Sequence, residues 1–143
     1  MYLNRLFVYG TLLPGLRNYH RFLAKYDPPY WPAKAKGIMY YIPDDHYPVV
    51  VDGEGDVYGV LYETKDLAVI LPVLDEIEKY TGVESQSHLI REIREVENLE
   101  TGEKVRAHMF LWPPSRREEL EKRGVRIESG DWLKFLRERG MEE

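Results

Sequence analysis

The stretch LFVYGTLLPG, residues 6–15, decides how the chain begins to fold, because a run of apolar and aromatic residues stops at a glycine. Residues 5–9 have the composition of a buried strand, and Gly10 follows it. Glycine lets the backbone approach a ligand closely, and the N–H groups of such a turn can bind an anion, with the Thr11 hydroxyl as a further donor. The alternative is an ordinary strand-to-helix turn. The glycine spacing of phosphate-binding and dinucleotide-binding loops is absent.

The rest of the pattern predicts about six strands and three or four helices. Apolar residues at helical spacing predict helices over residues 16–26 and 66–80. Two more helices should end at Gly124, after a Ser115–Glu118 capping box, and at Gly140, within the capped segment SGDWLKFLRERG. The predicted strands are residues 5–9, 35–42, 47–51, 57–63, 88–96 and 105–112, with a hairpin turn over 52–56. This order indicates an α+β fold with a largely antiparallel sheet, which could close into a small barrel flanked by helices.

The composition indicates one domain over residues 1–143. The net charge of -5 gives no reason to expect nucleic acid as a partner, and the absence of cysteine excludes thiol nucleophiles and thiolate metal sites. The sequence has neither a signal-peptide pattern nor an apolar run long enough for a membrane span, so we expect a soluble, cytoplasmic protein. A charged fraction of 31% with a single glutamine is typical of proteins from hot environments.

The segment PDDHYP, residues 43–48, carries two aspartates and a histidine that could suggest a metal site. With no second cluster of ligands in the sequence, we interpret it as a solvated loop and predict no metal. The oligomeric state stays open.

One carboxylate falls on the apolar side of the helix predicted over residues 66–80. On a helical wheel with Leu67 at zero, Glu78 falls at about 20°, inside the apolar arc. Asp75 and Glu76 fall on the opposite side, where solvent is expected. A carboxylate inside an apolar stripe is costly unless it is paired or hydrogen-bonded.

Two interpretations of Glu78 follow. In the first it reaches water near the helix end, or pairs with an arginine such as Arg91. In the second it is a partly buried general base, whose pKa is raised toward the range useful for proton transfer at neutral pH. Pro72 could kink the helix or start a second one, but either change keeps Leu74, Ile77 and Glu78 in register.

Five segments in order resemble the gamma-glutamylcyclotransferase-like superfamily, which includes the gamma-glutamylamine cyclotransferases. The segments are VYGTLLPG, KGIMYYIPDDHYPVVV, VYGVLYE, LDEIEKY and IESGDW. The resemblance covers essentially the whole chain and implies a small mixed α+β barrel with its site at one mouth. The sequence departs from the family's pattern at Lys79, where a glycine is usual, at Leu89, where a tyrosine is usual, and near the end of the later strand, where Phe110 or Trp112 replaces a tyrosine.

The resemblance also implies a reaction: the α-amine of a γ-glutamyl compound attacks its own γ-carbonyl, giving 5-oxoproline and a released amine or amino acid. Glu78 would be the catalytic acid/base, and no metal, nucleotide or other cofactor is needed. Arg91 would orient Glu78 or bind substrate, and a surface pair with a glutamate on the adjacent strand is its alternative. The substrate-binding residues implied in this way are Tyr9, Gly10, Thr11, Leu12 and Arg91.

Other functions remain open at this stage. The same fold could serve as a non-catalytic module that binds a small amino compound, although a carboxylate such as Glu78 on an apolar face argues for chemistry. It could also remove a γ-glutamyl protecting group from a larger biosynthetic intermediate. An interaction role is a third alternative, but the scattered tyrosines fit a core and a pocket better than an interface.

Overall fold

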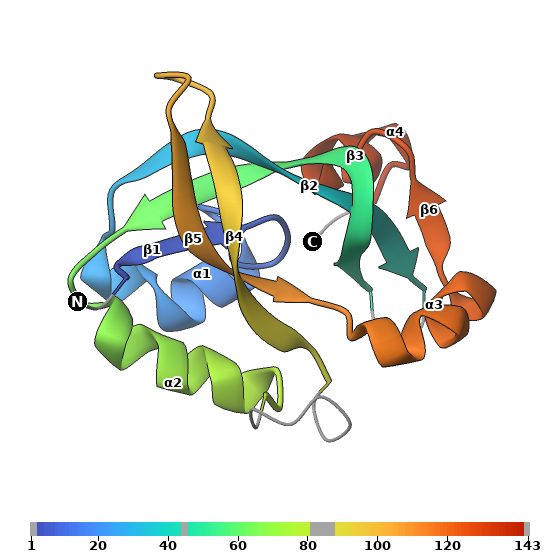
Figure 1. Ribbon diagram of the computed structural model, residues 1–143, viewed down its shortest axis with the longest axis horizontal. Coiled ribbons are helices and arrows are strands. Elements are labelled where there is room, and N and C mark those ends of the chain that lie inside the picture. The colour runs from blue at the N-terminus through green and yellow to red at the C-terminus, as the bar shows by residue number, and fades with distance from the viewer. Residues whose placement is uncertain (1–2, 44–45, 81–87, 142–143) are drawn as a thin grey trace.

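The computed structural model describes residues 3–43, 46–80 and 88–141, and Figure 1 shows the arrangement of its strands and helices. The strands are β1 (Arg5–Val8), β2 (Tyr30–Ile42), β3 (Tyr47–Glu63), β4 (Ile90–Asn98), β5 (Lys104–Leu111) and β6 (Val125–Ile127). The helices are α1 (Arg17–Phe22), α2 (Leu67–Ile77), α3 (Arg117–Arg123) and α4 (Trp132–Glu138), with short 3-10 turns η1 (Ala24–Tyr26) and η3 (Pro114–Arg116). None of the helices described is long and apolar enough to cross a membrane.

Strands β1 to β5 close into a barrel. Neighbouring strands follow the order β3-β1-β5-β4-β2-β6, and an additional pairing between β2 and β3 closes the ring, while β6 stays outside it beside β2. The pairing of β1 with β5 is parallel and the other pairings in the ring are antiparallel. The predicted α+β fold, a mixed and largely antiparallel barrel flanked by helices, is confirmed.

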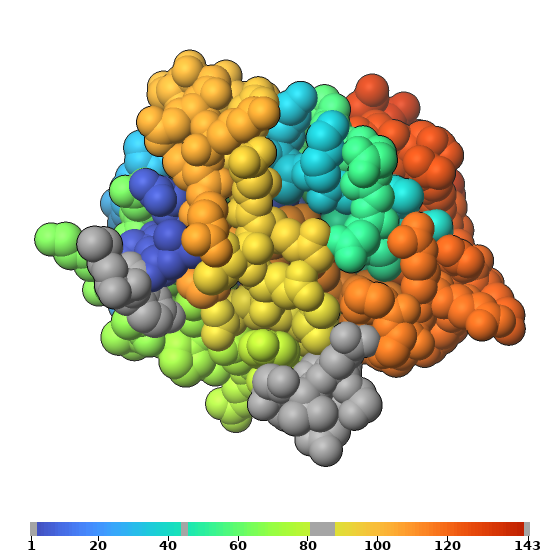
Figure 2. All heavy atoms as spheres, in the orientation of Figure 1, coloured from blue at the N-terminus to red at the C-terminus, as the bar shows by residue number. Residues whose placement is uncertain are grey.

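The helices cover the two ends of the molecule. Figure 1 shows α1 and α2 together at one end, and α3, β6 and α4 together at the other. The space-filling view in Figure 2 shows the side chains of β4 and β5 covering one face of the barrel between these ends. The core is apolar, and its largest fully buried side chains include Trp132, Tyr62, Phe7, Leu6, Leu23, Met39 and Ile42.

The hairpin turn predicted over residues 52–56 is wrong. Strand β3 runs without interruption from Tyr47 to Glu63 and pairs along β2, with a bulge between Lys36 and Ile38. The glycines of this segment permit close contact instead of a turn. A Cβ on Gly53 would lie 2.4 Å from Cγ1 of Ile38, and one on Gly55 would lie 2.8 Å from a backbone oxygen of β2. Figure 1 shows β3 bending in its course.

Helix α2 continues through Pro72 and ends at Ile77, three residues before the predicted end. Its buried residues are Leu67, Ile70, Leu71 and Leu74, as the wheel predicted. The buried face is nevertheless narrower than the wheel indicates, because Val73 and Ile77 are 45% and 41% exposed.

The two C-terminal helices differ in how well their ends were predicted. The capping box at Ser115 and Glu118 is wrong: α3 begins at Arg117, after the turn η3, and its N-cap residue makes no side-chain capping bond. The pair of prolines before Ser115 favours the 3-10 turn and moves the helix start along the chain. The predicted cap of α4 is confirmed, because the Asp131 carboxylate accepts a hydrogen bond from the Lys134 N–H at 3.1 Å.

Candidate functional site

A small, partly open pocket lies where β1, β3, β5 and the end of α2 meet. The cavity is lined by Phe7, Val8, Tyr9, Gly10, Thr11, Leu12, Tyr47, Pro48, Glu78, Leu89 and Phe110. The structure therefore brings together Glu78 and the four loop residues singled out from the sequence, and it leaves Arg91 outside this lining.

The loop Gly10–Leu12 is held in place through its carbonyl oxygens. The Leu13 N–H donates to the Gly10 carbonyl at 3.0 Å, and the Asn18 N–H donates to the Thr11 carbonyl at 3.1 Å. The Tyr62 hydroxyl donates to the Leu12 carbonyl at 2.8 Å. Within the described ranges, the N–H groups of the three loop residues have no protein acceptor.

The side chains of Asn18 and Pro48 lie against this loop and constrain it. The Asn18 amide donates to the Thr11 hydroxyl oxygen at 2.7 Å, so the hydroxyl proton of Thr11 is left to donate elsewhere. Glycine is required at position 10, because a Cβ there would lie 2.8 Å from Cγ of Pro48. The loop thus offers a set of donors next to the cavity, which suits an anionic ligand group.

Tyr9 is buried, and its hydroxyl donates to the Phe110 carbonyl at 2.8 Å. Burial raises the pKa of the Tyr9 hydroxyl well above its usual range, and negative charge on Glu78 or Tyr47 would raise that pKa further. Tyr9 is therefore neutral at physiological pH, and the polar ends of Tyr47 and Glu78 are close enough to influence it.

Glu78 lies at the C-terminal end of α2, where its N–H donates to the Leu74 carbonyl at 2.9 Å. Its own carbonyl accepts from the Leu89 N–H at 3.2 Å, which joins the helix end to the chain entering β4. Burial raises the pKa of the Glu78 carboxyl from 4.5 to about 7. No ion pair or hydrogen bond to this carboxylate is formed by the residues that the structure describes.

A carboxyl group with this pKa is present in both its protonated and its ionised form near neutral pH. It can therefore accept a proton in one step and return it in the next. The interpretation in which Glu78 pairs with Arg91 is not what the structure shows, because the guanidinium of that arginine lies against Asp75.

Arg91, on β4, makes a forked contact with Asp75 on α2. Its Nε donates to Oδ1 at 2.8 Å and its Nη2 to Oδ2 at 3.0 Å, and the two side chains are only 20% and 18% exposed. The remaining Nη1 lies 2.8 Å from Nδ1 of His108, and the guanidinium carbon lies 5.6 Å from the centroid of the Tyr80 ring. Arg91 thus ties the last turn of α2, which carries Glu78, to the barrel. The predicted exposure of Asp75 to solvent is wrong for the same reason.

Comparisons with known proteins identify the family. Residues 6–134 match the family described as gamma-glutamyl cyclotransferase, AIG2-like. The chain belongs to this family. A comparison with curated protein sequences finds no match.

Solved structures resemble this cyclotransferase-family chain at low sequence identity. YkqA from Bacillus subtilis is 24% identical with a TM-score of 0.68, over 97% of this chain and 43% of that protein. An uncharacterized protein from Pyrococcus horikoshii is 24% identical with a TM-score of 0.61, over 95% of each chain. An AIG2-like protein from Mus musculus is 22% identical with a TM-score of 0.61, over 80% of this chain and 82% of the other. At such identities the likeness establishes the fold.

Lys79 occupies the position where the sequence resemblance leads us to expect a glycine, and the backbone explains that expectation. Lys79 has a φ of 55°, in the left-handed region that favours glycine. The Tyr80 N–H donates to the Asp75 carbonyl at 2.7 Å and the Lys79 N–H to the Glu76 carbonyl at 3.1 Å, which is the Schellman pattern of a helix end. Helix α4 ends in the same pattern with Gly140 at a φ of 63°.

Reasoning from the sequence missed Tyr47 and Pro48 as lining residues. They open β3, far along the chain from the loop that follows β1, and only closure of the barrel brings them to it. No local pattern distinguishes Tyr47 from the other tyrosines. The sequence also contains no sign that Tyr47 contacts His88.

The described residues contain no group of three or more acidic or histidine side chains that could hold a metal ion. Asp44 and Asp45, which raised that question in the sequence, lie outside the described residues.

Proposed function

We propose that this protein is a gamma-glutamylcyclotransferase, which converts a γ-glutamyl amide into 5-oxoproline and a free amine or amino acid. The observation that carries the proposal is a partly buried glutamate whose pKa is raised to about 7, in a cavity shared with a loop of free backbone donors. Family membership supports the reaction class. Glu78 is the proposed acid/base, and the loop Tyr9–Leu12 the proposed substrate anchor.

The mechanism needs two proton transfers and no covalent intermediate with the protein. The Glu78 carboxylate accepts a proton from the substrate's α-amino group, and the amine nitrogen attacks the γ-carbonyl carbon to close a five-membered ring. The bond from that carbon to the leaving nitrogen then breaks, and the proton held by Glu78 passes to the leaving nitrogen. Because both reacting groups belong to one molecule, good alignment can contribute about 7–11 kcal/mol toward the barrier.

The Gly10–Leu12 loop has the chemistry to hold the substrate in the folded-back shape that this attack requires. Its N–H groups and the Thr11 hydroxyl proton are donors without a protein acceptor among the described residues, which suits an α-carboxylate. The proposed role of Arg91 is to position α2 through Asp75, since its guanidinium contacts that carboxylate and His108 and does not line the cavity.

A panel of γ-glutamyl amino acids, γ-glutamyl amines and glutathione tests the proposal, with release of 5-oxoproline as the readout. We expect the wild-type protein to cyclise at least one of them. The Glu78→Gln variant should lose at least about 10²-fold in turnover, while Glu76→Gln, whose side chain is exposed on the same helix, should stay within a few-fold. No 5-oxoproline from any substrate would favour the binding module, and full activity of Glu78→Gln would remove the assigned base.

A γ-glutamyl deprotecting enzyme would differ from the proposal only in taking a larger leaving group. The cytoplasmic location and the hot environment stay predictions from the sequence.

A further inference from the structure

Two tyrosines line the cavity, and they differ in what their hydroxyl groups can offer a ligand. The hydroxyl proton of Tyr9 is committed to the Phe110 carbonyl. The hydroxyl of Tyr47 is instead hydrogen-bonded to Nε2 of His88. A histidine ring nitrogen donates or accepts depending on the tautomer. Tyr47 can therefore present either a lone pair or a proton to a ligand, according to where His88 carries its own proton.

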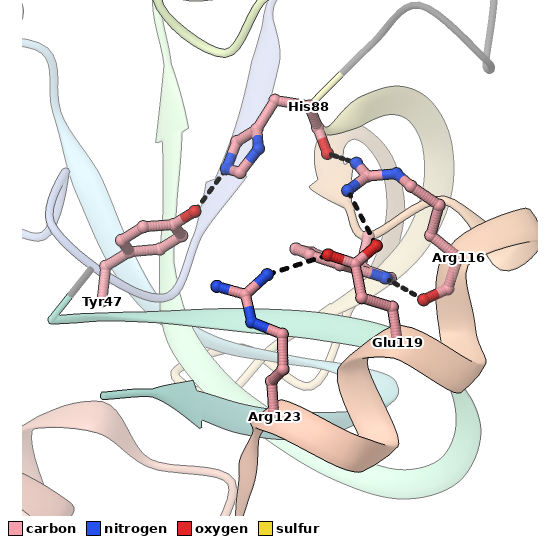
Figure 3. A network of polar contacts seen from close by, with 6 residues as sticks. Tyr47, His88, Arg116, Glu119 and Arg123 are labelled. Carbon is pink, nitrogen blue, oxygen red and sulfur yellow. Dashed lines mark hydrogen bonds and ion pairs between the residues drawn. The ribbon is translucent and has the colours of Figure 1, made fainter. Parts of the chain in front are cut away.

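His88 is held from several sides. Arg116 donates a hydrogen bond to the His88 carbonyl, and Figure 3 shows His88 lying between Tyr47 and Arg116. The His88 ring lies edge-on to the rings of Tyr47 and Trp112, with centroid distances of 5.9 Å to each. Trp112 is in turn fixed, because its Nε1 donates to the Arg116 carbonyl at 2.8 Å and the Arg116 guanidinium lies 4.3 Å from its ring centroid.

This arrangement extends away from the cavity. Arg116 lies 3.9 Å from Glu119, which also contacts Arg123 at 2.8 Å, so the network is anchored on α3 at the far end of the molecule from α2. The imidazole that contacts Tyr47 is thus placed by the fold itself, before any ligand arrives. A hydroxyl held in this way is preorganised, which is what a group that stabilises developing charge requires.

We propose that Tyr47 contacts the substrate in the cavity and that His88 is a positioning residue, which sets the direction of the Tyr47 hydroxyl. This inference adds a substrate-contacting residue to the proposed function. The effect on catalysis that we expect from it depends on that function. With the proton on Nε2, His88 donates to the Tyr47 oxygen, and the Tyr47 proton points to the ligand. There it donates a hydrogen bond to the γ-carbonyl oxygen as negative charge develops, and it is not transferred. Glu78 still carries both proton transfers.

A second tyrosine–histidine pair, Tyr41 with His46, serves as a control for the pair of Tyr47 and His88. The Tyr41 hydroxyl lies 3.2 Å from Nδ1 of His46, and both rings pack near Trp132, with centroid distances of 5.8 Å and 6.0 Å. Tyr41 lies opposite Pro48 in the β2–β3 pairing, next to the pair formed by Ile42 and Tyr47, but it does not line the cavity. Tyr41→Phe therefore removes a tyrosine–histidine contact at a residue that does not line the cavity.

The catalytic test measures kcat, KM and the thermal midpoint for Tyr47→Phe, His88→Leu, the double variant and Tyr41→Phe. We expect Tyr47→Phe and His88→Leu each to lower kcat/KM by about 10- to 100-fold, chiefly through kcat. The double variant should lose no more than either single variant, because both act through one hydroxyl. His88→Gln, whose amide can still donate, should recover part of the activity, and Tyr41→Phe should stay within about twofold. Additive losses, or an unchanged kcat/KM in Tyr47→Phe, would overturn the inference while leaving the proposed function in place.

A binding measurement separates the two proposals if no γ-glutamyl compound is cyclised. NMR titration with 5-oxoproline and with L-glutamate gives Kd for the wild type, Tyr47→Phe and Tyr41→Phe. A Kd raised at least about fivefold by Tyr47→Phe and unchanged by Tyr41→Phe would uphold the contact while the cyclotransferase function fails. Equal Kd values for the variants, or no binding of either compound by the wild type, would overturn the inference.

Discussion

Replacing Glu78 with glutamine should make the protein more stable at alkaline pH and leave its stability at acid pH nearly unchanged. Burial raises the pKa of Glu78 in the folded protein from 4.5 to about 7. Below the unfolded pKa both states are protonated and burial carries no charge penalty. Between the two pKa values the unfolded chain releases a proton that the folded protein retains, so the free energy of unfolding falls as the pH rises. Above about pH 7 the carboxylate is charged in both states and the penalty is complete.

The size of the effect follows from this pKa change. At about 1.36 kcal/mol for each pKa unit, the rise to about 7 disfavours the buried charge by about 3 kcal/mol. The Glu78 side chain is partly exposed, and solvent screening lowers the expected penalty to about 1–2 kcal/mol. Glutamine has a similar shape and no charge, so the variant should escape this penalty.

Urea denaturation between about pH 4 and about pH 8 measures the difference. The free energy of unfolding of Glu78→Gln should match that of the wild type at the acid end and exceed it by about 1–2 kcal/mol at the alkaline end. Glu76→Gln, an exposed position on the same helix, should show no such trend. A stability difference that does not change with pH, or a wild type that is the more stable protein at about pH 8, would refute the burial argument.

Three further predictions concern the same helix end and its anchors. The kcat/KM for a γ-glutamyl substrate should rise with pH through about 7 as Glu78 loses its proton, and a profile that falls over this range would contradict its role as base. Lys79→Gly should raise the free energy of unfolding by about 0.5–1 kcal/mol in urea denaturation. The variant removes the steric strain of a lysine in the left-handed region, and this gain should exceed the extra backbone entropy that glycine loses on folding. Gly140→Ala, at the equivalent position of α4, should lower it, and effects of the opposite sign would argue against the backbone explanation. Arg91→Lys should lower the free energy of unfolding by about 1–3 kcal/mol and reduce kcat more than it raises KM, because lysine cannot make the forked contact. Arg5→Lys, in an exposed pair with a glutamate, should change stability by less than about 1 kcal/mol, and equal effects of the two arginine variants would reject the positioning role.

Features that depend on neighbours in the chain could be predicted from the sequence. The apolar run before Gly10 forms β1, and Leu67 and Leu71 lie on the buried face of α2. Asp131 caps α4 because the donor it needs lies three residues along the chain. Glu78 was found for the same reason, since its place among the apolar residues is a property of one helix.

The prediction that failed in the sheet depended on a distant partner. Residues 52–56 have the composition of a turn, but β2 pairs with β3 on both sides of this segment, at Lys36–Asp56 and Ile38–Val51, and a shift in register takes up the residues between these pairs. At Gly53 and Gly55 the missing side chains make room for Ile38 and the backbone near Gly37, so glycine there serves packing between strands. Local propensity cannot distinguish these two uses of glycine.

The sequence alone determined that β1, α2 and α4 form and that one carboxylate stands on an apolar face, because these features depend on spacings within a few residues. Tertiary structure alone decided what surrounds that carboxylate. The contact of Tyr47 with His88 spans 41 residues and that of Arg91 with Asp75 spans 16. Such pairs meet only when β3, β4 and β5 have joined the closed barrel and α2 has docked beside it. The raised pKa of Glu78 likewise arises from burial, which no single element provides by itself.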